Sequence, residues 1–308
     1  MILVTGASGL LGASLVSLAQ ESGREVAGLY HRHPVQIAGA VLHAVDLTDD
    51  TAVNRVFEEL KPTVVIHCAA VTNVDWCEEH PEAARAVNVL GTATIAKISA
   101  RMNARLLYVS TDAVFDGIRG QYSETDQATP VNIYARTKLQ GEEETLRYCP
   151  AATIARVNMY GWNVQNKESL AEWILGRLMG GNPVPGFTDV SFCPIFANDL
   201  AAILLEMSNR NLPGLYHVVG AEPVSKYEFA RQVALTFGFD LEQVVATRVA
   251  DAKLKAPRPN NTTLNTQKVC AAIGHPMPNV GEGLRRFARM RDRGQRDRLN
   301  GQMTGVGK

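Results

Sequence analysis

The sequence has no excess of charge of either sign. Its 308 residues include 31 Lys and Arg and 31 Asp and Glu, which give a formal net charge of +0 at pH 7. A strongly basic chain would be drawn to nucleic acid or to an anionic membrane surface, and this balance supplies no such attraction. We therefore expect no nucleic acid and no membrane among its partners.

Disulfide signatures and long apolar runs are also missing. The five cysteines are odd in number and form no CxxC pair, which argues against a disulfide framework and indicates reduced thiols. No uninterrupted apolar run approaches the roughly 18 residues that a membrane-spanning helix needs. The first residues show neither the basic leader nor the small-residue cleavage site of a signal peptide. We expect a soluble protein of the cytoplasm.

Short apolar runs rich in β-branched residues are present, and they alternate with segments of helical spacing. The predicted strands cover residues 2–5, 25–30, 41–45, 63–69, 105–110, 153–157 and 215–219. The predicted helices between them cover residues 10–21, 51–60, 81–100 and 132–147. Apolar strands between helices predict an α/β fold with a Rossmann-type doubly wound parallel sheet covered on both faces.

Two segments leave this sheet, and each contains a predicted helix, Leu170–Met179 and Lys226–Phe237. We expect them to build a smaller substrate-binding lobe over the carboxyl ends of the strands, where ligands of such sheets bind. The predicted parts are a dinucleotide-binding domain (1–158 and 194–222), the lobe (159–193 and 223–290) and a polar, disordered tail (291–308). Arginines run from Arg285 into that tail; they indicate a solvated helix end, with binding of an acidic partner as the alternative.

A glycine-rich segment, Thr5-Gly6-Ala7-Ser8-Gly9-Leu10-Leu11-Gly12, joins the first strand to the first helix. Gly6 permits a tight turn, Gly9 lets the backbone approach a pyrophosphate, and Gly12 allows close packing of helix on strand. The helix N-terminus attracts the phosphate charge. The predicted dinucleotide contacts are Gly6, Ser8, Gly9, Leu10, Leu11 and Gly12. A purely structural glycine turn is the alternative.

The end of the second strand bears on the choice of cofactor. It reads Tyr30-His31-Arg32-His33, without the Asp or Glu that usually holds the ribose 2′-OH of NAD. Arg32 suits a 2′-phosphate, so we expect NADP(H) to be preferred and NAD(H) to be possible. The alternative is a solvent-exposed arginine. His31 and His33 have no third partner of metal-ligand type, so we predict no metal.

Three later positions complete the expected cofactor cleft. Asp46-Leu47 follows the third strand and is predicted to contact the adenine. Ala69-Ala70 ends the fourth strand with side chains small enough to let the nicotinamide ribose approach. Asn88 lies in the next helix, where an ordinary polar residue would be the simplest interpretation without the rest of the pattern.

Tyr134 and Lys138 are one helical turn apart, so they share a helix face. An ammonium beside a phenol favours the phenolate, so we expect the pKa of Tyr134 to fall below its ordinary value near 10. Thr111 or Ser110, at the end of a strand, is placed to share the same carbonyl oxygen. Together these residues predict a proton-donating site, to which a bound dinucleotide would supply the hydride.

These motifs resemble the extended short-chain dehydrogenase/reductase superfamily. Within it, residues 110–117 (Ser-Thr-Asp-Ala-Val-Phe-Asp-Gly) resemble the STDYVFDG signature of dTDP-4-dehydrorhamnose reductases. Residues 258–266 resemble that family's RPxNSxLNT motif, which general short-chain reductases lack. The resemblance covers roughly residues 1–290.

Two positions depart from the family pattern. Ala113 stands where the family usually has Tyr, and the RTSWVYG-like segment at 156–163 has its tryptophan missing or displaced to Trp162. Both departures fall where the sugar nucleotide would be held. The resemblance therefore predicts the cofactor half and the catalytic core more closely than the substrate.

The resemblance implies a reductase of a nucleotide-activated 4-keto-6-deoxy sugar. A hydride would pass from the nicotinamide to sugar C4 while Tyr134 protonates the alkoxide. Lys138 would bind the nicotinamide ribose, Thr111 would orient the keto oxygen, and Asn88 would support Lys138 through a water. The implied substrate contacts are Thr72, Asp112, Trp162, Arg258 and Asn261, with Arg258 and Asn261 on the diphosphate and nucleotide.

Two other readings of the same resemblance stay open. One is another extended sugar-nucleotide epimerase or dehydratase, although Thr111-Asp112 lacks the following Glu usual in dehydratases. The other is a non-catalytic NADP-binding regulatory protein similar to the beta subunit of methionine adenosyltransferase. The expected partners are a nucleotide-sugar substrate and a second copy of the chain in a homodimer.

Overall fold

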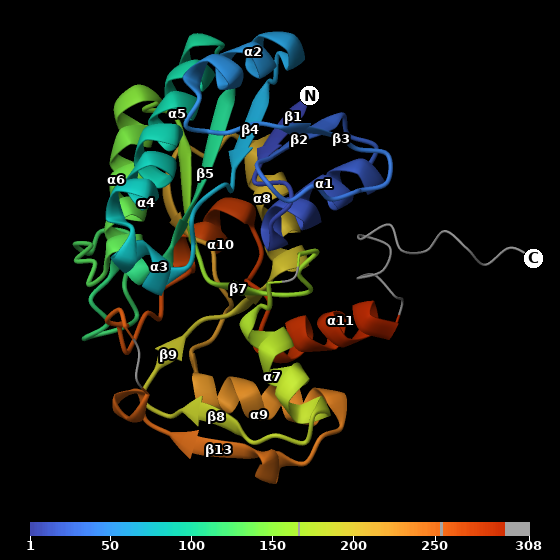
Figure 1. Cartoon of the computed structure of the whole chain (residues 1–308), viewed down its shortest axis with the longest axis vertical. Helices are drawn as coiled ribbons and strands as arrows, with labels where there is room; N and C mark the ends of the chain where they lie inside the picture. The colour runs from blue at the N-terminus through green and yellow to red at the C-terminus, as the bar shows by residue number, and fades with distance from the viewer. Residues whose placement is uncertain (166, 253–254, 293–308) are drawn as a thin grey trace, which may run out of the picture.

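The computed structural model describes residues 1–165, 167–252 and 255–292. Its centre is a seven-stranded parallel sheet in the order β11-β6-β5-β4-β1-β2-β3 (Figure 1). The strands are β1 (Ile2–Thr5), β2 (Val26–Tyr30), β3 (Val41–Ala44), β4 (Val64–His67), β5 (Arg105–Thr111), β6 (Thr153–Val157) and β11 (Gly214–His217). All seven predicted strands occur, and the doubly wound α/β fold is confirmed.

Helices cover both faces of this sheet. On one face α1 (Leu10–Glu21) packs against α8 (Ala197–Arg210), and on the other lie α2 (Asp50–Leu60), α5 (Thr92–Arg101) and α6 (Ile133–Tyr148). Strands buried on both sides need apolar residues at successive positions, which is why β1 begins with Ile-Leu-Val and β4 with Val-Val-Ile.

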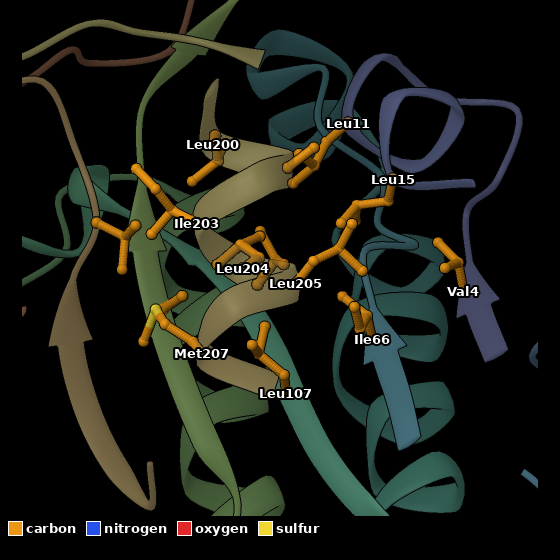
Figure 2. Packing of buried hydrophobic residues seen from close by; sticks show 14 of the residues in the cluster. Val4, Leu11, Leu15, Ile66, Leu107, Leu200, Ile203, Leu204, Leu205 and Met207 are labelled. Atoms are coloured by element: carbon orange, nitrogen blue, oxygen red, sulfur yellow. The ribbon is translucent and has the colours of Figure 1, made fainter. Parts of the chain in front are cut away.

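The first face shows how the apolar residues meet. Leu11 and Leu15 of α1 and Leu204 of α8 belong to one buried cluster with Val4 of β1 and Leu107 of β5 (Figure 2). All five side chains are nearly or fully inaccessible to solvent. Their burial supplies the hydrophobic driving force that fixes α1, and with it the turn that precedes α1.

The predicted helix over residues 81–100 is three pieces in the structure. α4 (Pro81–Arg85) leads into a π-helical turn, η1 (Ala86–Gly91), and then into α5. A π turn inserts one extra residue per turn and is often found at functional sites. α3 (Val74–Glu79) precedes this run and was not predicted.

A smaller lobe lies at one end of the sheet (Figure 1). Its elements are β7 (Met159–Tyr160), α7 (Leu170–Met179), β8 (Val184–Phe187), β9 (Ser191–Phe192), β10 (Ile195–Phe196), β12 (Val224–Ser225), α9 (Lys226–Phe237), β13 (Val244–Thr247) and α11 (Val280–Asp292). It has its own aromatic core, in which Tyr160 meets Phe229 and Phe287 edge to face. The remaining elements are η2 (Asp112–Val114), η3 (Leu241–Gln243), η4 (Val249–Asp251) and α10 (Gln267–Ile273).

Both predicted lobe helices have the predicted bounds because their starts are strongly specified. Ser169 before α7 and Ser225 before α9 each accept a hydrogen bond from the backbone of a glutamate three residues later, whose carboxylate returns to the serine N–H. This reciprocal arrangement is a capping box.

Helix α11 continues to Asp292, so the predicted tail boundary at residue 291 falls inside a helix. The rest of the predicted disordered tail, 293–308, lies outside the described residues. Within the described ranges, no helix combines the length and apolar character that crossing a bilayer requires. The domain boundaries stay a prediction.

Candidate active site

The turn between β1 and α1 depends on glycine at two positions. Gly6 has φ +69°, and a Cβ there would lie 2.8 Å from the backbone of Ala69. A Cβ at Gly12 would lie 2.1 Å from the carbonyl oxygen of Gly6, which is a direct clash. Gly9 caps α1 without any side chain on the first N–H groups. The turn thus has the shape and the exposed N–H groups that suit a pyrophosphate.

A cavity of about 560 Å³ starts at this turn and follows the carboxyl ends of the strands. Most of the predicted site residues line it: Gly6, Ser8, Gly9, Leu10, Leu11, Gly12, Asp46, Leu47, Ala69, Ala70, Thr72, Thr111, Asp112, Tyr134 and Lys138. The predicted residues that do not line it are Arg32, Asn88, Trp162, Arg258 and Asn261. The structure therefore joins the predicted cofactor and catalytic residues and separates most of the predicted substrate contacts from them.

Tyr134 and Lys138 project from α6 toward the end of β5. Asn132 sets the start of α6 by accepting a hydrogen bond from the backbone of Ala135. The Lys138 Nζ donates to the carbonyl oxygen of Val109 at 2.8 Å. Burial lowers the pKa of Lys138 to about 7.

The expected fall in the pKa of Tyr134 is not what the structure shows. Burial raises the pKa of Tyr134 to about 12, and a hydrogen bond with Thr111 opposes this only in part. The expectation was wrong because Lys138 directs its ammonium at a backbone carbonyl and is itself destabilised by burial. Tyr134 is a protonated phenol at neutral pH, which is the form that a proton donor needs.

Thr111, and not Ser110, has the hydroxyl that bonds with Tyr134. The Ser110 hydroxyl donates to Glu142 at 2.5 Å, and Glu142 forms a buried two-point ion pair with Arg156 at 2.9 and 2.7 Å. No motif had predicted a role for this ion pair. It fixes the strand end from which Thr111 projects.

Asp112 is buried and holds the smaller lobe to β5. Its carboxylate accepts hydrogen bonds from Asn158 at 2.7 Å, Thr262 at 2.5 Å and Thr111 at 3.2 Å. Burial raises the pKa of Asp112, and the bonds from Thr262 and Asn158 oppose that rise. A carboxylate with three protein donors is a positioning group, although one side of it reaches the cavity wall.

Asn88 lies in the π-helical turn and clamps the loop after β4. Its Oδ1 accepts from the Val71 N–H at 2.8 Å, and its Nδ2 donates to the Val71 carbonyl at 3.1 Å and to Thr137 at 3.0 Å. The π turn aims this amide at the loop. Support of Lys138 through a water stays a prediction.

Arg258 and Asn261 are engaged away from the cavity. Arg258 pairs with Asp75 of α3 at 3.0 Å and donates to the carbonyl of Ala256. The Asn261 carboxamide accepts from the Thr263 hydroxyl at 2.8 Å. The geometry gives their predicted diphosphate and nucleotide contacts no support, because Arg258 pairs with α3 and Asn261 bonds within its own loop.

Trp162 is turned into the lobe core. Its Nε1 donates to the Phe287 carbonyl at 2.9 Å, and its ring stacks on the Phe287 ring at 4.2 Å. A tryptophan held in this way packs α11 against the loop after β7. Its predicted contact with substrate has no support in this geometry.

The adenosine end of the cavity differs from the expectation in one respect. Asp46 and His31 line it, 3.3 Å apart, whereas Arg32 does not. The Thr48 N–H bonded to Asp46 lowers the pKa of that carboxyl. No acidic residue follows β2, but Asp46 follows the neighbouring strand β3 and supplies a carboxylate at this place. No set of three His, Cys, Asp or Glu residues suited to a metal ion occurs in the part of the chain that the structure describes.

Two cavity residues had no signal in the sequence. Gln165 Nε2 donates to the Ser8 carbonyl at 2.6 Å and to the Ser8 hydroxyl at 2.9 Å. Lys167 Nζ donates to the Thr72 hydroxyl at 2.6 Å. These side chains reach the cavity because residues 163, 165 and 167–169 all lie along its wall.

A parallel sheet with this glycine turn, and a Thr111–Tyr134–Lys138 trio at its carboxyl edge, defines an extended short-chain dehydrogenase/reductase. Residues 1–292 match the family described as the RmlD substrate binding domain, and the chain belongs to that family.

Three proteins that are similar to this chain carry different names. The probable low-salt glycan biosynthesis reductase Agl14 of Haloferax volcanii is 33% identical over 285 residues, 91% of this chain and 95% of Agl14. The methionine adenosyltransferase 2 subunit beta of Danio rerio is 33% identical over 279 residues, 87% and 83% of the two chains. The solved dTDP-4-dehydrorhamnose reductase of Bacillus anthracis, in complex with NADP, has a TM-score of 0.81 and 26% identity, covering 94% and 98%. Family and neighbours support an oxidoreductase with a nicotinamide cofactor.

Proposed function

We propose that the protein reduces a nucleotide-activated 4-keto-6-deoxy sugar with a nicotinamide cofactor. The observation that carries this proposal is the meeting of Thr111 and Tyr134 in the same cavity as the glycine turn. That turn suits a dinucleotide because it leads into the N-terminus of α1, where Gly9 leaves the first N–H groups without a side-chain partner. When bound, a reduced nicotinamide supplies the hydride.

The protein's own residues handle the proton. Tyr134 holds its proton at neutral pH, since burial raises its pKa to about 12, so it can donate to an alkoxide forming at the keto carbon. The Thr111 hydroxyl lies beside the phenol and would stabilise the same oxygen by turning its proton from Asp112 toward it. Lys138, one helical turn along α6, would contact the nicotinamide ribose with the donors that its bond to the Val109 carbonyl leaves free.

NADP(H) is the proposed cofactor, with NAD(H) possible. The NADP complex of the Bacillus anthracis relative supports it. Arg32 follows β2 and is the cation nearest in sequence to the cavity residues His31 and His33. Asp46 on the neighbouring strand end supplies an acceptor for a ribose 2′-OH, so both cofactors have a polar partner.

The proposal is tested with a panel of dTDP-, UDP-, GDP- and CDP-linked 4-keto-6-deoxy sugars. NADPH absorbance reports turnover, and NMR of the product gives the C4 configuration. Consumption of NADPH with one of these substrates supports the reductase. A panel without any turnover, with NADPH bound, would contradict it.

A regulatory function is the second candidate, because the methionine adenosyltransferase beta subunit is 33% identical. The presence of Tyr134 and Lys138 does not distinguish this function from a reductase, since a binding protein can retain both residues. Co-purification with a methionine adenosyltransferase catalytic subunit, together with a silent substrate panel, would favour it. Another extended epimerase or dehydratase would instead convert a sugar nucleotide without net NADPH consumption; a dehydratase is disfavoured by Ala113 after Asp112.

A further inference from the structure

Lys167 is a cavity cation that the mechanism above leaves unused. The described lysines that line the cavity are Lys138 and Lys167. Lys138 is committed to the Val109 carbonyl, whereas Lys167 bonds only to a neutral hydroxyl, that of Thr72. Among the described residues, no carboxylate forms an ion pair with Lys167. An ammonium held over a cavity by one hydroxyl is ready to receive an anion.

The position of Lys167 separates it from the expected cofactor pyrophosphate. The glycine turn is covered by Gln165, which bonds to Ser8. Lys167 instead bonds to Thr72, in the loop after β4. Val71, next to Thr72, bonds to Asn88, which also bonds to Thr137 of α6, the helix that carries Tyr134, and this connection places Lys167 toward the reacting end.

We propose that Lys167, together with the Thr72 hydroxyl, binds the diphosphate of the nucleotide-sugar substrate. This inference rests on the proposed function. In such a substrate the diphosphate is attached to C1, across the sugar ring from C4, so its receptor must lie one ring away from the Tyr134 phenol. Arg258, the candidate from the sequence, is already paired with Asp75.

The chemistry of the pair suits a diphosphate. Lysine binds phosphate as a point charge with three donors, and a threonine hydroxyl can turn its proton to a second phosphate oxygen once an anion takes the ammonium. The bond between Lys167 and Thr72 therefore holds the receptor in place before the substrate arrives.

The test uses the NADP⁺-saturated protein and titrates it with UDP and with dTDP by calorimetry. Lys167→Gln keeps a donor for Thr72 but removes the charge. A hydrogen bond to a charged group contributes about 1.5–3 kcal/mol, so Kd for the nucleoside diphosphates should rise by about 10- to 150-fold. Thr72→Val should raise Kd for the nucleoside diphosphates less, by about 2- to 10-fold, which corresponds to the loss of a neutral hydrogen bond.

The matched control is Lys97→Gln, which removes the same charge from the exposed surface of α5. It should leave every Kd unchanged. A separate titration of each variant with NADPH distinguishes the two diphosphate sources, and Kd for NADPH should stay within about twofold of wild type. With an active substrate, KM should rise in Lys167→Gln far more than kcat falls.

The outcomes separate the two claims. Unchanged UDP and dTDP affinity in Lys167→Gln overturns the assignment of Lys167 while the proposed function stands. Loss of NADPH affinity in place of nucleoside diphosphate affinity also overturns it and assigns Lys167 to the cofactor. If wild-type protein binds NADPH but neither UDP nor dTDP, the titration is repeated with GDP and CDP; binding of none of the four means that the assignment and the proposed function both fail.

Discussion

The buried ion pair behind the active site gives the sharpest prediction. Arg156 and Glu142 are 5% and 6% exposed and share two hydrogen bonds, at 2.9 and 2.7 Å. Arg156→Met removes the guanidinium and leaves the Glu142 carboxylate buried, with only the Ser110 hydroxyl as a donor on its oxygens. Breaking a buried pair in this way costs about 3–5 kcal/mol.

The measurement is urea unfolding, followed by circular dichroism and by tryptophan fluorescence. Arg156→Met should lower the free energy of unfolding by about 3–5 kcal/mol. The double variant with Glu142→Gln should regain more than half of that loss, because no charge is then left buried without a partner. The carboxamide that replaces the carboxylate in this double variant would still accept a hydrogen bond from Ser110.

An exposed pair provides the control. Arg147 and Glu144 are 67% and 26% exposed and lie 3.4 Å apart on the same helix. Arg147→Met should cost less than about 1 kcal/mol, as exposed pairs do. The reasoning is refuted if Arg156→Met costs no more than Arg147→Met, or if the double variant is as unstable as Arg156→Met alone.

Three further predictions concern the site. Tyr134→Phe should lower turnover by about 10²–10⁴-fold, the range for loss of a general acid, while NADPH titration shows unchanged affinity; turnover near that of wild type would remove Tyr134 from the mechanism. Burial holds the pKa of Lys138 at about 7, below its unfolded value of 10.5. Between these two pH values the unfolded protein binds more protons than the folded protein, so the contribution of Lys138 to the free energy of unfolding rises with pH. Urea unfolding at pH 7 and pH 9 should therefore show a smaller rise in Lys138→Met than in wild type, and equal rises would contradict the shift. Arg32→Ala should raise the dissociation constant of NADPH by about 10-fold or more and change that of NADH little. Equal rises for the two cofactors would contradict a contact between Arg32 and the 2′-phosphate.

Much of the cofactor half could be predicted from the sequence because its signals are local. The glycine turn and the spacing of Tyr134 and Lys138 depend on a few neighbouring residues, and both appear in the structure as expected. Local spacing also gave α7 and α9, whose capping residues mark their first turns.

The failures share a different cause, since they depend on contacts across the fold. The pKa of Tyr134 depends on burial, and the role of Arg258 depends on Asp75 of α3, far away in sequence. The π turn that divides the predicted helix over residues 81–100 orients Asn88 toward the β4 loop. Lys167 lies along the cavity wall, where it bonds to Thr72 of the loop after β4. None of these contacts leaves a periodic pattern in the chain.

The hydrogen bond between Asp112 and Thr262 has a consequence for how the protein folds during its synthesis on the ribosome. The two residues are 150 positions apart, and Tyr122 and Leu264 form a second bridge across a similar separation. At about 5–20 residues per second, the strand bearing Thr111 waits roughly 8–30 s for the segment that completes its end. A nascent chain can thus assemble its dinucleotide half early, yet it acquires a finished catalytic end only after Thr262 has been synthesised.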